Sequence, residues 1–242
     1  MNATVAQLTA RSLLGRRRTI VLMLLPLALL ALAVLVRALA GTDEETAAGL
    51  LGAFGIAIMM PLLGLIAGTG SIGPEIDEGS IVYLLAKPLN RYSIVVTKLA
   101  VALGVIVTFG VVPIAIAGLI MTSSLGGVTA AYAVGAFAAG AAYAAIFICL
   151  AVITKNAVVV GLIYALIWES LIGGIVPGAQ ALSVQQWSLA VAEKTYGSIA
   201  STLGLNSAVD FGTGLVLLLI VTIGTTAYAG RRLQTLRLND DA

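Results

Sequence analysis

The sequence predicts an all-α, polytopic membrane protein with six transmembrane helices. Of its 242 residues, 60% are hydrophobic and only 10% are charged, which is too little polar surface for a soluble fold of this length. The apolar residues form runs of about 20, the length that a helix needs to cross a hydrocarbon core roughly 30 Å thick. These runs are continuous rather than alternating, which favours helices over a β-barrel.

The predicted crossings are separated by short polar segments. We place them at residues 20–40, 47–72, 94–121, 130–153, 157–176 and 211–229. The basic start and Ala38-Leu39-Ala40 also resemble a signal peptide with its cleavage site. However, the apolar stretch at 20–36 is longer than a usual signal-peptide core and more crossings follow, so a retained first helix is favoured.

Residues 1–18 form a basic head, for which two interpretations are open. Val5, Leu8 and Ser12 share a helical face with Arg11 beside them, which fits a helix lying in the membrane interface. A frayed polar terminus is the alternative.

Prolines and glycines mark the later crossings. We expect a kink at Pro113 in the third crossing and the end of the sixth crossing at Gly230. Pro61 lies inside the second crossing, where neighbouring helices can satisfy the backbone carbonyl that it frees. The fourth crossing carries two ridges of small residues, which can pack within one subunit or between subunits. They are Ala136, Gly140 and Ala144, and Ala131, Gly135 and Ala139.

The segment at 177–210 is a moderately polar connection before the last crossing. Val184, Trp187 and Val191 fall near one helical face, and Trp is favoured at membrane interfaces. This pattern predicts a helix or helical hairpin lying in the outer interface.

The basic residues predict the orientation. Eleven of the 13 Lys and Arg residues fall in the head, the 72–98 region, the turn at Lys155 and the C-terminal tail, whereas Arg37 and Lys194 fall on the other side. The positive-inside rule therefore places both termini and the 72–98 region in the cytoplasm.

The 72–98 region is a charged island of three acids and three bases between two apolar runs. Gly73-Pro74 is expected to end the second crossing, with Pro74 in the first turn of a new helix and Glu75 where acids favour a helix N-terminus. Pro88 breaks the segment, and Arg91 and Lys98 follow. Such a helix could dock into a groove on a cytoplasmic partner, or it could be an ordinary solvated connection.

Motifs for chemistry by this chain alone are absent from the sequence. It has no G-x-x-x-x-G-K-[ST], G-x-S-x-G or H-E-x-x-H motif. With no histidine and one cysteine, Cys149, a zinc or copper site of the usual ligands is not expected. The net charge of +2, without a basic patch interleaved with aromatics, argues against nucleic acid.

One motif resembles a known family. The run E-x-D-E-G-S-x3-L-L-A-K-P-L-N-R-x6-K is similar to the signature of type-2 ABC-transporter permeases. The matching residues are Glu75, Glu78, Gly79, Leu84, Leu85, Pro88, Arg91 and Lys98, and Asp77 lies among them.

This resemblance implies a single permease domain at 1–242, with an interfacial elbow helix in the head, a coupling loop at 73–93 and an extracellular connection at 177–210. Glu75 to Leu85 would form a coupling helix resting on a separate ATPase subunit, with Glu75, Asp77, Glu78, Gly79, Leu84, Leu85, Pro88 and Arg91 as the coupling residues.

The same resemblance implies two permease subunits, expected to be a homodimer, with two copies of an ABC ATPase that bind ATP and Mg. This chain would bind no cofactor and carry out no catalysis. It would be a multi-pass protein of the cell membrane, a bacterial plasma membrane, and part of an exporter. Its apolar path suits a hydrophobic or amphipathic substrate.

Two charged residues inside or beside the crossings have alternative interpretations. Glu169 could line the translocation path or make a structural hydrogen bond near the outer interface. Arg37 is expected to snorkel to the headgroups, or else to pair with Asp43 or Glu44.

Two other function classes compete with an exporter subunit. A secondary transporter predicts an inverted repeat and several charges at mid-depth, and neither is clear in the sequence. A membrane assembly or immunity protein would bind no ATPase.

Overall fold

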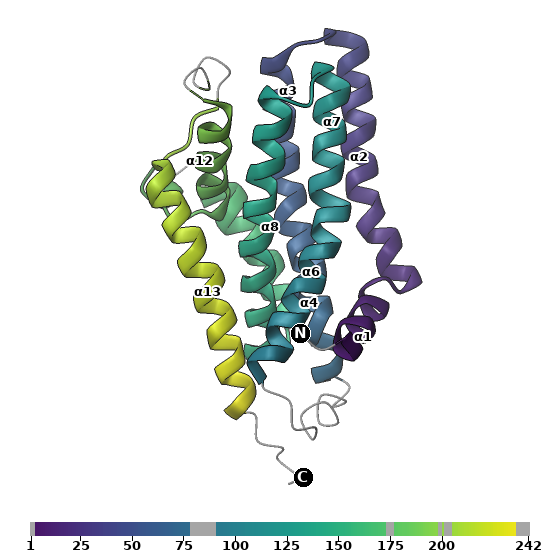
Figure 1. Ribbon diagram of the computed structural model, residues 1–242, viewed down its shortest axis with the longest axis vertical. Helices are drawn as coiled ribbons and strands as arrows, with labels where there is room; N and C mark the ends of the chain where they lie inside the picture. Colours follow the sequence, from purple (N-terminus) through teal and green to yellow (C-terminus); the bar gives the residue numbers. More distant parts are fainter. Residues whose placement is uncertain (1–2, 78–90, 173–176, 198–199, 201–204, 236–242) are drawn as a thin grey trace.

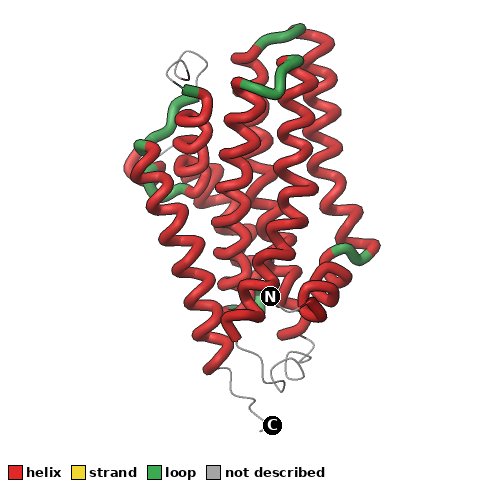
Figure 2. Tube along the Cα trace, viewed as in Figure 1, coloured by secondary structure: helices red, strands yellow, loops and turns green. Residues whose placement is uncertain are grey.

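The computed structural model describes residues 3–77, 91–172, 177–197, 200 and 205–235, and these residues fold into a bundle of long helices (Figure 1). Loops connect the helices, and no strand occurs in the described ranges (Figure 2). The elements are α1 (Ala3–Leu13), α2 (Arg16–Ala40), α3 (Glu44–Leu50), η1 (Leu51–Met59), α4 (Met60–Asp77), α6 (Arg91–Ile106), η2 (Val107–Val111), α7 (Val112–Thr122), α8 (Gly127–Ile153), α9 (Ala157–Ile163), η3 (Tyr164–Ile172), α11 (Pro177–Gln180), α12 (Val184–Tyr196) and α13 (Phe211–Thr235).

The bundle has two distinct ends. We call the end that holds α1, the described end of α4 and the start of α6 the lower end, and the opposite end, where α2 and α7 finish, the upper end (Figure 1). Successive long helices run up and down between these ends, so α13 finishes at the lower end, beside the start of α6. Most described bases lie on elements at the lower end, as the charge asymmetry of the sequence predicts.

Five helical runs in the described part of the chain are long and apolar enough to cross a membrane. They are Arg18–Ala40, Glu44–Ile76, Arg91–Thr122, Gly127–Ile153 and Phe211–Gln234. They correspond to five of the six predicted crossings, and the multi-pass helical fold is confirmed.

The remaining predicted crossing, 157–176, is a shorter apolar helix at Ala157–Glu169 that η3 extends to Ile172. Residues 173–176 lie outside the described ranges. A count of six crossings, with both termini in the cytoplasm, stays a prediction.

Helix α8 is the central element of the bundle and packs against α4, α12 and α13. Its contacts depend on small residues. A Cβ on Gly68 of α4 would lie 2.7 Å from Cβ of Phe147, and one on Gly135 of α8 would lie 2.9 Å from the Ser188 carbonyl oxygen of α12. A Cβ on Gly140 would meet Ile106 of α6 at 2.6 Å. Both small-residue ridges therefore pack against other helices of the same chain.

Two π-helical segments precede prolines. Segment η1 ends at Met59, two residues before Pro61, and η2 ends at Val111, two residues before Pro113. A proline has no N–H to donate to the carbonyl four residues earlier, which in both cases lies inside the π segment. The distortion expected at Pro113 is thus a wider turn just before the proline.

Two predicted helix ends are wrong. Helix α4 continues through Pro74 to Asp77, so Gly73-Pro74 does not end it and Glu75 does not begin a new helix. Helix α13 continues through Gly230 to Thr235. Gly230 allows a close helix contact instead, because a Cβ there would lie 2.5 Å from the Tyr92 ring of α6.

The head is the helix α1, and it packs against α4 and α6. Its buried face differs from the predicted one: Val5, Thr9 and Leu13 are buried, whereas Leu8 and Ser12 are exposed. Residues four apart lie on one helical face, and the observed buried face includes Thr9, which a pattern of apolar residues alone does not identify. Thr9 is buried because its hydroxyl takes part in hydrogen bonds with the Val5 carbonyl and with Lys98.

Candidate functional site

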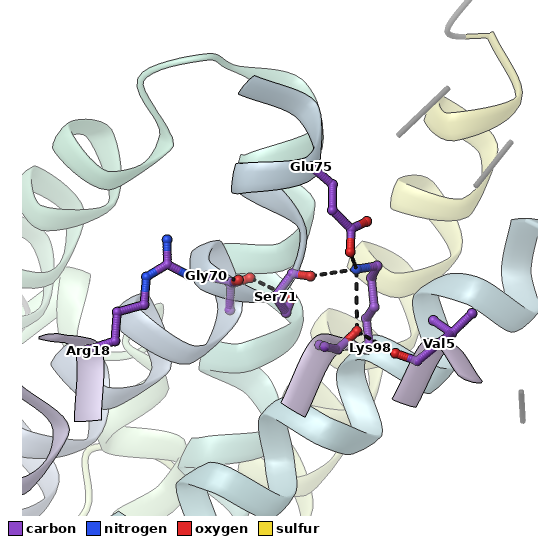
Figure 3. A network of polar contacts seen from close by, with 8 residues as sticks. Val5, Arg18, Gly70, Ser71, Glu75 and Lys98 are labelled. Carbon is purple, nitrogen blue, oxygen red and sulfur yellow. Dashed lines mark hydrogen bonds and ion pairs between the residues drawn. The ribbon is translucent and has the colours of Figure 1, made fainter. Parts of the chain in front are cut away.

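The lower end holds a buried polar cluster built from three helices, which we call the lower cluster: Thr9 of α1, Ser71 and Glu75 of α4, and Lys98 of α6 (Figure 3). Lys98 lies two turns inside α6, and its side chain is 0% exposed. Lys98 was identified in the sequence as a base that follows the charged loop, and the structure places it inside the bundle. It faces the bundle, where a buried cation needs partners.

Lys98 has one acceptor for each of its three ammonium protons. Its Nζ donates to Glu75 Oε1 at 2.7 Å, to the Ser71 carbonyl oxygen at 2.6 Å and to Thr9 Oγ1 at 3.5 Å. Thr9 Oγ1 in turn donates to the Val5 carbonyl oxygen at 2.8 Å. An ammonium group has three donors and no acceptor, so this set satisfies it.

Arg18 of α2 holds the opposite side of the same α4 turn. Its Nη1 donates to the Gly70 carbonyl oxygen at 3.2 Å (Figure 3). Gly70 lies four residues before Pro74, whose nitrogen carries no proton and cannot donate to that carbonyl. Arg18 therefore compensates for the proline that α4 carries in its last described turns, and four helices converge on Gly70 and Ser71.

This cluster borders the predicted coupling loop on both sides. Glu75 lies near the described end of α4, and Arg91 is the first residue of α6. Within the described residues, Arg91 Nη1 is buried without a hydrogen-bond partner. Glu78, Gly79, Leu84, Leu85 and Pro88, and the side chain of Asp77, lie outside what the structure describes. The coupling role of the set stays a prediction.

A second buried charge, Glu169 in η3, belongs to the other half of the chain. Its side chain is fully buried and receives four hydrogen bonds. Oε1 accepts from the Tyr164 hydroxyl at 2.8 Å and from the Val184 N–H at 3.1 Å. Oε2 accepts from the Ser183 hydroxyl at 2.5 Å and from the Gln185 N–H at 3.3 Å.

These contacts make Glu169 the cap of α12. Val184 and Gln185 are the first two residues of that helix, where N–H groups lack partners within the helix and the dipole favours an anion. The Ser183 hydroxyl at the N-cap position donates to Glu169 and does not cap the helix itself. The arrangement fits the structural hydrogen-bond interpretation, and a place in the translocation path stays a prediction.

Helix α12 packs along the bundle and does not lie apart from it. It contacts α8 and α13, and Trp187 is buried with its indole N–H donating to the Ala181 carbonyl oxygen at 2.8 Å. The apolar face of Val184, Trp187 and Val191 was recognised in the sequence, but its partners are protein helices.

Arg37 takes a partner that the sequence did not indicate. Its Nη1 donates to the Met121 carbonyl oxygen at 3.1 Å, in the last turn of α7. Carbonyls there lack helical donors and attract cations. This contact joins α2 to α7 at the upper end, in place of snorkelling or a pair with Asp43 or Glu44.

A sequence signal for the lower cluster existed but was incomplete. A lysine seven residues after Arg91, two turns into an apolar helix, predicts a buried partner. The structure shows that this partner is Glu75, on the other side of the loop. Nothing in the sequence identified Thr9 or the Ser71 carbonyl, because a hydroxyl and a backbone oxygen carry no distinguishing pattern.

Together, the long apolar helices and the buried, fully bonded charges define a polytopic membrane protein. Residues 14–176 match the profile of the ABC-2 family transporter proteins, which is more than half of the chain. The chain belongs to this family, and it is a multi-pass permease of the cell membrane. Family membership implies association with an ABC ATPase. A comparison with curated proteins finds no match.

Proposed function

We propose that the protein is the membrane subunit of an ATP-driven exporter and that the lower cluster transmits the motion of the ATPase to the helices. In this proposal the lower end faces the cytoplasm and residues 73–93 rest on the ATPase. ATP and Mg bind to the ATPase subunit. Two copies of this chain work with two ATPases. The observation that supports the proposal is the position of the Glu75–Lys98 pair, at the two helix ends that the 78–90 segment connects.

The physical argument rests on how many elements share one buried cation. A displacement of the loop would pull on α4 and α6 together, and the Lys98 bonds oblige Ser71, Glu75 and Thr9 to follow or to separate. Separation leaves a buried charge without its partner, which costs about 3–5 kcal/mol. The helices therefore move as a unit over small displacements.

The central α8 would carry this motion to the upper half. It packs against α4 through Gly64 and Gly68 and against α12 through Gly135. Close packing makes such contacts stiff, because a core transmits strain when it has no free volume. The few charges among the described helices favour a hydrophobic or amphipathic substrate.

The test uses Glu78 and Arg91, two predicted coupling residues within the 73–93 loop. The protein is reconstituted with its ATPase, and ATP hydrolysis is measured for the wild type and for a Glu78→Ala/Arg91→Ala variant. We expect the variant to insert into the membrane normally and to lose stimulation of hydrolysis. Normal stimulation in this variant would refute the coupling assignment.

Arg231→Gln is the matched control. Arg231 is an exposed base near the described end of α13, at the same end of the bundle but on another helix. Hydrolysis at the wild-type rate in this control shows that loss of one lower-end charge is not enough to disturb coupling.

A further inference from the structure

The lower end carries a cavity of about 350 Å³ on the side of α4 that faces α9. Arg18 of α2, the turn at Thr154–Asn156 and the stretch of α4 from Leu65 to Pro74 surround it. Neither the lower cluster nor the Glu169 cap uses this space. Its lining includes two bases, Arg18 and Lys155, which we call the rim, and a set of aliphatic side chains, which we call the wall.

The rim carries charge of one sign. Arg18 and Lys155 both line the cavity, and its lining includes no acidic side chain. In the described part of the chain neither base forms an ion pair with a carboxylate. Arg18 uses one of its five guanidinium N–H groups for the Gly70 carbonyl, and this bond fixes the guanidinium at the cavity. Two bases in one cavity lining, neither of them paired with a carboxylate of the described residues, attract an anion with several acceptor oxygens.

The wall is apolar and opens to the outside of the bundle. Leu65 and Ile66 of α4 line the cavity together with Val158 and Val159 of α9. Val158 is 58% exposed and Val159 is 59% exposed, so the first turn of α9 presents aliphatic side chains to the surroundings. In a membrane-spanning protein this exposed face meets acyl chains.

We propose that this cavity binds one anionic phospholipid, with its phosphate on Arg18 and Lys155 and an acyl chain against Leu65, Ile66, Val158 and Val159. Basic pockets between helices at a membrane surface suit such headgroups. A zwitterionic lipid fits less well, because its quaternary ammonium group would lie beside the two bases. A soluble phosphate would use the rim but gain nothing from the wall.

The bound lipid would touch the turn of α4 that the lower cluster holds. Arg18 binds Gly70 from the cavity side, and Lys98 binds the adjacent Ser71 carbonyl from the other side (Figure 3). A phosphate on Arg18 would therefore be connected to the Glu75–Lys98 pair through two adjacent residues of α4, Gly70 and Ser71. Lipid binding does not depend on export, so the test below is independent of the proposed function.

The experiment measures lipid affinity of the purified, delipidated full chain by native mass spectrometry. Phosphatidylglycerol and phosphatidylcholine with identical acyl chains are titrated separately, and glycerol 3-phosphate serves as the headgroup without chains. We expect one tightly bound phosphatidylglycerol per chain, bound about tenfold or more tightly than phosphatidylcholine. Glycerol 3-phosphate should compete only at far higher concentration.

The charge variants decide the site. Each base near an anionic headgroup contributes roughly fivefold in affinity, so Lys155→Gln should weaken phosphatidylglycerol about fivefold and Arg18→Gln/Lys155→Gln about 30-fold. Phosphatidylcholine affinity should change little. Arg231→Gln, which removes an exposed base of the same end outside the cavity, should bind as the wild type does.

Lys155→Gln keeps the proposal testable if loss of Arg18 prevents folding, because Lys155 is exposed on a turn. Unchanged phosphatidylglycerol affinity in Lys155→Gln would overturn the assignment. Equal affinity of the wild type for the two lipids would overturn it as well. Competition by glycerol 3-phosphate at the concentration of the lipid would show a soluble phosphate site and also reject the proposal.

Discussion

In the described part of the chain, Lys98 and Glu169 are buried charges of opposite sign, and their charges are compensated in different ways. Lys98 is paired with another charge, Glu75 of α4, and its remaining protons go to the Ser71 carbonyl of the same helix and the Thr9 hydroxyl of α1. Glu169 has no countercharge among its partners in the described residues: two hydroxyls and the first two N–H groups of α12 donate to it. The Lys98 contacts join helices from distant parts of the sequence, whereas the Glu169 contacts join segments that follow each other closely in the sequence.

This difference suggests different roles. The Lys98 contacts connect residues 23, 27 and 89 positions apart, so they report on how α1, α4 and α6 lie relative to each other. The Glu169 contacts span only 5 to 16 positions and fold one local unit, η3 with α12. The lower cluster can respond when a partner moves these helices, whereas the Glu169 cap keeps η3 and α12 in one arrangement.

Loss of Glu75 should have the largest effect. Glu75→Leu leaves Lys98 charged and buried, and we expect a loss of about 3 kcal/mol in the free energy of unfolding, since the pair is buried on the lysine side and 24% exposed on the glutamate side. Unfolding by sodium dodecyl sulfate in mixed micelles measures this change.

Adding Lys98→Met to Glu75→Leu should recover most of that loss, because an apolar pair of similar size leaves no uncompensated charge. A double variant as unstable as Glu75→Leu would show that the charge pair itself stabilises the fold, which would blur the contrast between the two sites.

Loss of Glu169 should cost less. Glu169→Gln removes the charge and one acceptor oxygen but keeps the size of the side chain and an amide oxygen for two of the four donors, so we expect a loss of about 2 kcal/mol. Amide hydrogen exchange should accelerate at Val184 and Gln185 and leave α6 unchanged. Exchange that accelerates equally in α6 would contradict the local character of this site.

The contact of α4 with α8 should be sensitive to a glycine-to-alanine substitution at Gly68, whereas the same substitution at Gly73 should be tolerated. Gly68→Ala places a Cβ 2.7 Å from Cβ of Phe147 and 3.1 Å from a backbone oxygen, and we expect a loss of about 1–3 kcal/mol.

Gly73→Ala is the matched control on α4, since a Cβ there meets nothing within 4 Å. It should be neutral or stabilising by about 0.5–1 kcal/mol through helix propensity. Equal losses in both variants would argue against close packing at Gly68.

The smallest effect is expected at the upper surface. The Tyr196 hydroxyl donates to Glu44 Oε2 at 2.9 Å, and this hydrogen bond raises the pKa of the phenol above its usual 10.0. A raised pKa in the folded state means that the contact stabilises fully below pH 10 and is lost as the pH rises through the folded value. Thermal melting should show a small loss above pH 10 that Tyr196→Phe abolishes.

Helix types and their approximate extents were predictable from sequence because lipid imposes a simple rule on long apolar runs. The ends at Pro74 and Gly230 were not, because tertiary contacts decide them: Arg18 satisfies the carbonyl that Pro74 leaves open, and Tyr92 needs the space that Gly230 provides. Local propensity describes neither contact.

The candidate site was half predictable. Glu75, Arg91 and Lys98 were identified from the motif, and Glu169 from its depth in an apolar run. The pairing of Lys98 with Glu75 was not predicted, because the interpretation of Pro74 as a helix end placed Glu75 at the start of a separate cytoplasmic helix. The cap on α12 requires a helix start that returns to Glu169, and a single sequence does not show that return.

The most direct test compares coupling in two variants that both fold. ATP hydrolysis is measured for the reconstituted complex with Glu75→Leu/Lys98→Met, in which stability is expected to recover, and with Glu169→Gln, which keeps the shape of the cap. We predict that the first binds the ATPase but no longer stimulates it, and that the second stimulates it as the wild type does. Full stimulation with Glu75→Leu/Lys98→Met would contradict a transmitting role for the lower cluster.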